Sequence, residues 1–316
     1  MTMNPLFTIA IPAYKRKFLY EAVDSCLQQT YKNLEIVIVN DASPEDLDSV
    51  ILQFNDPRIR YYHNKENCGA VNVVDNWNIC LSHAKGDYII CMGDDDRLLP
   101  YCLEEYYNLM KKYPNLGVYH AWTELIDEES NFISIQQPRP EFETALSLAW
   151  NRWNGRNKQF IGDFCYDTER LRQEGGFYKI PLAWGSDDIT AVRAARHAGI
   201  ANTQTICFQY RVNRQTITKT GNASLKISAV LQEKDWFLNF ISEQHAAIID
   251  LDSLDAKYLI CLKQDLPIYF REKLKREIII DMKSNPLRIF KWILNQQFLE
   301  LDNKELFKCW LKSIVK

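Results

Sequence analysis

Apolar residues in the first half of the chain form short, near-continuous runs that alternate with helically spaced sets. The short runs predict strands, and the second is apolar enough to be buried on both faces of a sheet. Strands separated by helices of this length indicate βαβ units and a mainly parallel sheet with right-handed crossovers. The predicted strands cover about 8–11, 34–39, 58–63 and 87–92, and the predicted helices cover about 18–29, 45–54 and 100–113, with a further helix ending near 84.

The second half of the chain alternates less regularly and becomes mostly helical towards its end. We therefore expect an α/β domain over residues 1–220 and a helical C-terminal region over 221–316. Inside the first domain, residues 1–115 and 116–220 form two halves that differ in how regularly strands and helices alternate. The elements predicted for the second half are a strand near 118–123, a helix near 187–197 and a strand near 205–212.

Composition places the chain among ordinary globular proteins, because 47% of its residues are apolar and 25% are charged. The 38 Lys and Arg against 41 Asp and Glu give a net charge of −3, so no overall field attracts nucleic acid. Nine scattered cysteines without a C-x-x-C pair indicate reduced, buried thiols in a cytoplasmic protein. We expect neither a signal peptide nor a spanning helix, and hence a soluble or at most peripheral protein.

Three consecutive carboxylates, Asp94, Asp95 and Asp96, follow the strand predicted at 87–92. In open α/β sheets, ligands bind beyond the carboxyl ends of the strands. Adjacent carboxylates repel one another unless a cation lies between them, and Mg²⁺ is usually held by one or two carboxylates together with substrate phosphates. The alternative is an exposed turn that caps the next helix. Taken alone, the triplet does not distinguish a metal site from a cap.

Two other residues follow predicted strands and suit a nucleotide. Asp41 can accept a hydrogen bond from a base or a ribose, and Tyr14 can cover a planar base. Asp41 as a turn or cap residue and Tyr14 as surface packing are the alternatives. The turn at 67–69 contains a glycine that would allow close approach of a ligand.

Taken together, these segments resemble the inverting nucleotide-sugar glycosyltransferases of family 2, which have the GT-A fold. The resemblance covers about residues 6–212, and its motifs occur in the family's order. The matching segments are Thr8–Tyr14, Ser25–Tyr31, Leu34–Ser43, Asn67–Gly69, Gly86–Ile89 and Asp94–Asp96.

The resemblance implies a GT-A, Rossmann-like sheet flanked by helices, with a nucleotide-binding half before an acceptor-binding half. It implies that Pro12, Tyr14 and Asp41 line the base pocket and that Asp94 and Asp95 also lie at the nucleotide, with Asp95 near the ribose or the metal. Asp96 would coordinate a Mn²⁺ or Mg²⁺ ion on the donor diphosphate. Such an ion stabilises the negative charge that develops on the leaving nucleoside diphosphate.

A second acidic pair, Asp187 and Asp188, resembles the family's Glu-Asp pair, with Asp in place of Glu. An inverting transfer needs one carboxylate to accept the proton of the acceptor hydroxyl, and we assign this role to Asp188, with Asp187 as the fallback. The alternative is a helix cap formed by Ser186 or Asp187. The adjacent Trp184 would stack on an acceptor sugar, or serve as ordinary core.

The segment around Arg211 and Arg214 resembles one in which a basic residue faces the diphosphate. This chain departs from the family pattern at three places: Asn213 stands where His is frequent, Asn40 stands where Asp is frequent, and the segment Asn76-Trp77-Asn78 stands where Arg often precedes Asn. We therefore expect no diphosphate-facing arginine at the last of these.

These features predict an inverting glycosyltransferase for surface polysaccharide synthesis of the bacterial type. The donor would be a nucleotide sugar, UDP-linked by our expectation, and the acceptor a hydroxyl of a glycan or a lipid-linked saccharide. The alternatives are a non-catalytic carbohydrate-binding protein on the same fold and a metal-dependent nucleotidyltransferase. In the tail, basic and apolar residues interleave over 271–291. They indicate either a peripheral contact at the inner face of the membrane or a solvated face packed on the catalytic domain.

Overall fold

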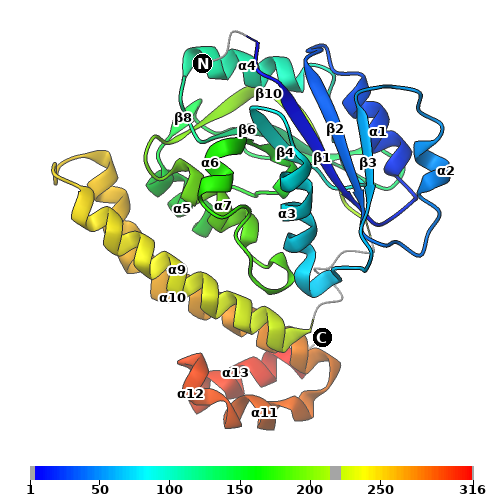
Figure 1. Ribbon diagram of the computed structural model, residues 1–316. Coiled ribbons are helices and arrows are strands. Elements are labelled where there is room, and N and C mark those ends of the chain that lie inside the picture. The colour runs from blue at the N-terminus through cyan, green and yellow to red at the C-terminus, as the bar shows by residue number, and fades with distance from the viewer. Residues whose placement is uncertain (1–3, 214–221, 315–316) are drawn as a thin grey trace. The chain divides into compact units, whose positions relative to one another are not determined.

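The computed structural model describes residues 4–213 and 222–314, which form two compact units (Figure 1). The first unit contains the described residues up to 179 together with 186–213. The second contains 180–185 together with 222–314. Residues 180–185 thus belong with the C-terminal helices, although in the sequence they lie between two stretches of the first unit.

A single ten-stranded sheet is the centre of the first unit, in the order β3-β2-β1-β4-β9-β6-β10-β5, with β7 paired to β6 and β8 to β10. Most paired residues lie in parallel ladders, those of β1 with β2 and β4, of β2 with β3, and of β6 with β10. The strands are β1 (Phe7–Ala13), β2 (Leu34–Asn40), β3 (Ile59–His63), β4 (Tyr88–Cys91), β5 (Arg97–Leu98), β6 (Val118–Ile126), β7 (Phe132–Ile135), β8 (Phe142–Glu143), β9 (Phe164–Asp167) and β10 (Ile200–Arg211).

Helices cover both faces of this sheet. Alternate side chains of β1, including Phe7, Ile9 and Ile11, pack in one buried cluster with residues of α1, α2 and α4. The opposite face of β1 and β2 contacts α3. The helices are α1 (Leu19–Leu27), α2 (Asp48–Ile51), α3 (Val73–His83, preceded by the 3₁₀ turn η1, Ala70–Asn72), α4 (Cys102–Lys112), α5 (Ala145–Trp153), α6 (Thr168–Gln173) and α7 (Ser186–Ala195), with a further 3₁₀ turn, η2, at Ile161–Asp163.

The predicted alternation of strands and helices is confirmed, with two differences in length. The helix expected over 45–54 is a single turn, α2, because the Asp46 carboxylate accepts the Ser49 N–H and starts the helix late. The final strand begins at Ile200 rather than near 205, because Ile200 and Ala201 pair with β8 and β6. Two-face burial explains the apolar character of β2, in which every residue is buried.

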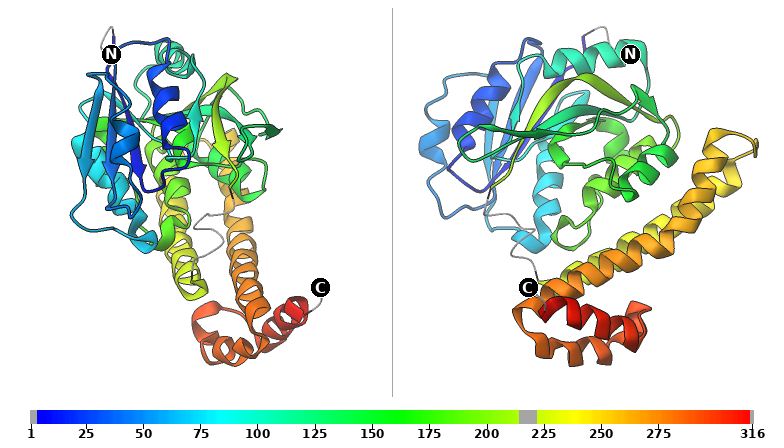
Figure 2. Two further views of the ribbon diagram at one scale, coloured as in Figure 1. Left: turned by 90° about the vertical axis from the view of Figure 1, so that its right-hand side faces the viewer. Right: turned by 180° about the vertical axis from the view of Figure 1, so that it is seen from behind.

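The second unit is helical. Two long helices, α9 and α10, pack side by side around Phe237 and Phe270, followed by three shorter helices (Figure 2). Its elements are η3 (Pro181–Ala183), α9 (Ala223–Ala247), α10 (Leu254–Ser284), η4 (Pro286–Arg288), α11 (Ile289–Leu294), α12 (Gln296–Leu299) and α13 (Asn303–Ile314).

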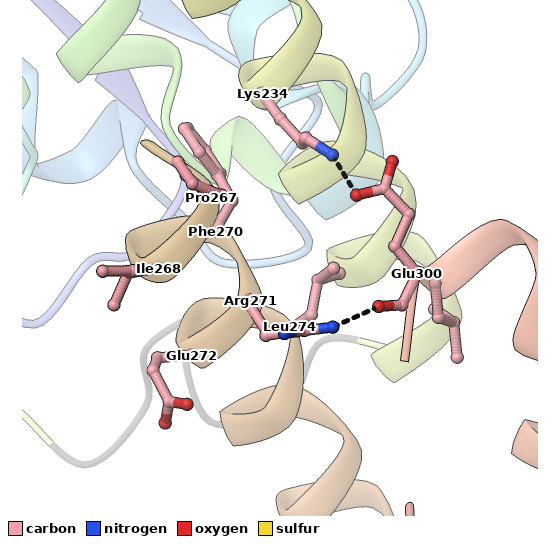
Figure 3. Close-up of a pocket in the computed structure, with 9 residues that line it drawn as sticks. Lys234, Pro267, Ile268, Phe270, Arg271, Glu272, Leu274 and Glu300 are labelled. Atoms are coloured by element: carbon pink, nitrogen blue, oxygen red, sulfur yellow. Dashed lines mark hydrogen bonds and ion pairs between the residues drawn. The ribbon is translucent and has the colours of Figure 1, made fainter. Parts of the chain in front are cut away.

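Glu300 ties the short helices to the long pair, as Figure 3 shows. Its carboxylate accepts a 2.6 Å bond from Lys234 of α9, and its backbone carbonyl accepts a 3.0 Å bond from Arg271 of α10. Glu300 has left-handed backbone angles, which end α12 and turn the chain towards α13. None of the described helices is both long enough and apolar enough to span a bilayer.

Candidate active site

The carboxyl ends of β1, β2 and β4 meet at one edge of the sheet because the three strands are parallel and in register. Ala13 pairs with Asn40, and Ala10 pairs with Cys91. The backbone N–H of Asp41 donates to the carbonyl of Ala13 at 2.9 Å, which continues the β1–β2 ladder past the strand end. The residues that follow these strands therefore come together, although they are far apart in the sequence.

Asp94 fastens the loop after β1. One of its carboxylate oxygens accepts the backbone N–H of Tyr14 at 2.7 Å and that of Lys15 at 2.6 Å. Burial, with the negative charge of Asp95, raises the pKa of Asp94 to about 6. Tyr14 itself is exposed, whereas Pro12 lies partly buried within β1. Asp94 thus acts on the loop that carries Tyr14, and Tyr14 offers an accessible ring at the edge.

Asp41 is buried in a polar network with the segment after β3. Its carboxylate accepts bonds from the Asn64 amide at 2.7 Å and from the backbone N–H of Cys68 at 3.0 Å. Its backbone carbonyl accepts a 2.6 Å bond from Asn67. The sequence did not identify Asn64 as a site residue. Only the nearby turn at 67–69 indicated that this segment approaches a ligand. Asp41 therefore holds the segment after β3 in place at this edge of the sheet.

Asp95 and Asp96 converge beside Gly93. The Asp96 and Asp95 carboxylates each place an oxygen close to the point where a Cβ on Gly93 would lie, at 2.9 and 3.0 Å respectively. The other oxygen of Asp96 accepts the backbone N–H of Arg211 at 2.9 Å. Burial and the charge of Asp95 raise the pKa of Asp96 well above its usual value. The lack of a side chain at Gly93 leaves room for both carboxylates.

This pair suits a divalent cation. Two hard oxygen donors share a small space next to a glycine, and their mutual repulsion is relieved by a bound proton or a bound cation. Among the described residues, no three acidic, histidine or cysteine side chains form a complete cage. A pair of carboxylates matches the way in which Mg²⁺ and similar ions bind, with the remaining ligands supplied by water and substrate phosphate.

Asn213 and Lys15 flank the pair. The amide of Asn213 donates to the Asp95 carboxylate, and the Lys15 ammonium lies 4.0 Å from it. Burial raises the pKa of Asp95, and the positive charge of Lys15 opposes this effect. Asn213, which occupies the position where the family often has histidine, is therefore a hydrogen-bond donor to a site carboxylate.

Arg211 is completely buried, and its guanidinium is engaged by the protein. It donates to the carbonyl of Asp95 at 2.8 Å, to the carbonyl of Asp127 at 3.0 Å, to the Ser130 hydroxyl at 2.9 Å and to the Glu21 carboxylate at 2.9 Å. These contacts hold the acidic loop against the turn after β6. Arg214, the other expected diphosphate ligand, lies outside the described residues.

The second acidic pair begins α7. Asp188 is only 2% exposed, and its carboxylate accepts a 2.8 Å bond from Arg152 of α5. Asp187 is half-buried, and its carboxylate accepts the backbone N–H of Asp188 at 3.0 Å. Burial, together with the negative charges of Asp96, Asp95 and Asp187, raises the pKa of Tyr210. Asp188, in contrast, faces Arg152.

Trp184 belongs to the second unit, where the ammonium of Lys226 lies 4.4 Å from the centre of its ring. The Asn76–Asn78 segment has structural partners in the first unit. Asn78 exchanges hydrogen bonds with the backbone of Phe177, and a Cβ on Gly176 would collide with the Asn78 amide. The side chain of Asn78 thus requires glycine at position 176, in the segment Gly175-Gly176-Phe177.

The curated proteins that this chain matches include several described as glycosyltransferases. A putative colanic acid biosynthesis glycosyl transferase, WcaA of Escherichia coli K12, is 43% identical over 103 residues, which are 32% of this chain and 36% of the relative. The chain spans less than half the length of several curated relatives that it matches.

Two solved structures share the fold. One is Staphylococcus aureus TarS 1–349 in complex with UDP-GlcNAc, with a TM-score of 0.60, 12% identity, and coverage of 98% of this chain and 82% of that one. The other is the mannosyltransferase PcManGT of Pyrobaculum calidifontis in complex with GDP-Man and Mn²⁺, with a TM-score of 0.55, 17% identity and coverage of 99% and 86%. The expected GT-A-type fold, with its helical C-terminal region, is confirmed. Residues 8–172, just over half of the chain, match Glycosyl transferase family 2, and the protein belongs to that family.

Proposed function

We propose that this protein transfers a sugar, with inversion, from a UDP-linked donor to a hydroxyl of a glycan or a lipid-linked saccharide. The observation that carries the proposal is the convergence of Asp95 and Asp96 beside Gly93, at the edge of parallel strand ends that also carries Tyr14 and Asp41. Membership of the family supports transferase activity, and structural neighbours described in complex with UDP-GlcNAc or with GDP-Man and Mn²⁺ support a nucleotide sugar and a divalent ion.

At the donor end, the exposed ring of Tyr14 covers the base, while Asp41 and its network form the wall beside it. Asp95 approaches the ribose or the ion. Asp96, with Asp95, would hold Mn²⁺ or Mg²⁺. When bound, such an ion supplies Lewis-acid stabilisation of the negative charge on the departing diphosphate.

At the acceptor end, we assign the base to Asp187, the fallback of the sequence analysis, in preference to Asp188. Asp188 is 2% exposed and its carboxylate accepts a bond from Arg152, whereas Asp187 is only partly buried, and a base must be accessible to the acceptor hydroxyl. The acceptor oxygen attacks the anomeric carbon as the bond to the diphosphate oxygen breaks, and Asp187 takes the hydroxyl proton. Asp188, held by Arg152, orients the start of α7.

Paired substitutions test this assignment. Asp187→Asn is expected to reduce turnover at least about 100-fold while UDP affinity changes little, because general bases contribute about 10²–10⁴-fold. Asp188→Asn is the matched control, with a lower melting temperature as its main effect. The measurements are release of UDP from a panel of nucleotide sugars and UDP binding with and without Mn²⁺. Near-normal turnover in Asp187→Asn would remove the base assignment.

The donor site has its own test. Asp96→Ala is expected to abolish the Mn²⁺-dependent part of the thermal shift that UDP produces. A wild-type protein that ignores UDP with every divalent ion tried would refute the nucleotide-sugar proposal as a whole. The E. coli relative, described as a putative colanic acid biosynthesis enzyme, supports a role in surface polysaccharide synthesis, which we place on the cytoplasmic side of the membrane.

A further inference from the structure

The second unit exposes an unusual amount of apolar side chain. Of the 24 large hydrophobic residues exposed in the described chain, 14 belong to this smaller unit. On α13, Phe307, Leu311 and Ile314 are 40–52% exposed and recur at i, i+4 and i+7, so they form one stripe along the solvent side of the helix. Trp310 packs against the ring of Phe307, with centroids 5.5 Å apart. We call these four residues the α13 stripe.

Helix α11 of the same unit also exposes apolar side chains. Phe290 and Leu294 of α11 are exposed at i and i+4, while Trp292 between them is buried. Helices α11 and α13 contact each other within the unit. Exposed apolar residues scattered singly are normal, but aligned sets on neighbouring helices mark an interaction surface.

Basic side chains border the α13 stripe. Lys308 and Lys312 line a groove of about 400 Å³ between α10 and α13, together with Arg276 and Lys283. The two carboxylates in this groove, Glu272 and Glu305, each accept a 2.9 Å contact from Lys275, so the other four cations are not neutralised by them.

Charge in the sequence follows the same division. Residues 271–316 contain eleven Lys and Arg against six Asp and Glu, a net charge of +5, whereas the rest of the chain carries −8. An amphipathic helix with aromatic and aliphatic residues on one side and lysines beside them is the form that binds at an anionic lipid surface. Pairing two copies through this surface would bring like charges together.

We propose that the α11–α13 end of the second unit docks on an anionic phospholipid bilayer. The α13 stripe enters the boundary between head groups and acyl chains, and the cations of the adjacent groove face lipid phosphates. This surface goes beyond the proposed sugar transfer and does not depend on it, because none of its residues belongs to the candidate active site.

Sedimentation of the full chain with vesicles tests the proposal. Binding is expected with phosphatidylcholine vesicles containing roughly 30% phosphatidylglycerol, and not with phosphatidylcholine alone. Phe307→Ser with Leu311→Ser should weaken partitioning at least about tenfold. Lys308→Glu with Lys312→Glu should weaken it about 25-fold or more, since each lysine near an anionic surface contributes about fivefold.

The matched controls make the same kinds of substitution at exposed residues that lie outside the proposed surface. Phe132→Ser with Ile135→Ser on β7, and Lys257→Glu with Lys263→Glu on α10, should partition like the wild type. Mn²⁺-dependent UDP binding should be the same in all four variants, which separates this proposal from the active-site proposal. Unchanged partitioning of the stripe or lysine variants overturns the proposal. A wild-type protein that does not bind anionic vesicles also overturns it. This includes the case in which the wild type self-associates and the stripe variant does not, because the stripe would then bind a second copy instead of lipid.

Discussion

Replacing Arg211 with lysine distinguishes a structural role of this residue from a role in binding diphosphate. The buried guanidinium contacts five protein acceptors: three backbone carbonyls and a hydroxyl in partly buried surroundings, and the Glu21 carboxylate, which is 44% exposed. A lysine ammonium is a point donor on a flexible stem and cannot reach acceptors on opposite sides of a planar fork. Arg211→Lys therefore leaves at least two of these partly buried acceptors without their donor.

The cost follows from these contacts. Each buried acceptor left unsatisfied costs about 1–3 kcal/mol, and the exposed ion pair with Glu21 adds less than about 1 kcal/mol. We expect a loss of about 3–5 kcal/mol in the free energy of unfolding. For a unit of about 200 residues this corresponds to a fall in melting temperature of roughly 6–20 °C.

The assay is thermal unfolding followed by tryptophan fluorescence, with UDP binding measured below the transition. Arg97→Lys is the matched control, because Arg97 pairs with the same Glu21 carboxylate at 3.7 Å but is partly exposed. It should change the free energy of unfolding by less than about 1 kcal/mol. If Arg211→Lys melts like the wild type but binds UDP more weakly, the structural role is refuted and a role of Arg211 in binding the diphosphate is supported.

Two further substitutions address the site and the fold. Gly93→Ala puts a Cβ about 3 Å from the Asp95 and Asp96 oxygens. Calorimetry should therefore find Mn²⁺-dependent UDP binding at least about tenfold weaker. Unchanged affinity would contradict a cation site formed by these two carboxylates. Glu35→Gln removes a buried carboxylate whose pKa, despite desolvation, is lowered by bonds from a backbone N–H, a hydroxyl and a guanidinium. It should cost about 1–3 kcal/mol at pH 7. In urea unfolding, the deficit should shrink as the pH falls below about 4.5 and the wild-type carboxyl takes up its proton; a deficit independent of pH would contradict the charge assignment.

Much of the fold could be predicted because each element depends on its own residues. The apolar run of β2 and the helical spacing of Leu19, Ala22, Val23 and Cys26 in α1 indicate buried surfaces before any tertiary contact is known. The short α2 could not be predicted, since one side-chain bond from Asp46 decides where that helix starts.

The candidate site divides in the same way. Strand ends in a parallel sheet place Tyr14, Asp41 and Asp94 together by topology alone, so their residue types indicate a ligand edge. Their individual partners lie outside that rule. The two backbone bonds to Asp94 and the amide network of Asp41 join residues 23 to 80 positions apart.

The order of residues along the chain determined the βαβ alternation, the carboxylates at the strand ends, the family resemblance and the basic, apolar character of the tail. The tertiary structure decided which of two adjacent aspartates meets Arg152, that Arg211 is enclosed by protein acceptors, and that Phe307 and Leu311 remain exposed. The reason is physical. Periodicity and residue type report whether a segment can bury one face, whereas a side chain's charge state and accessibility depend on neighbours that only the folded chain brings within hydrogen-bonding distance.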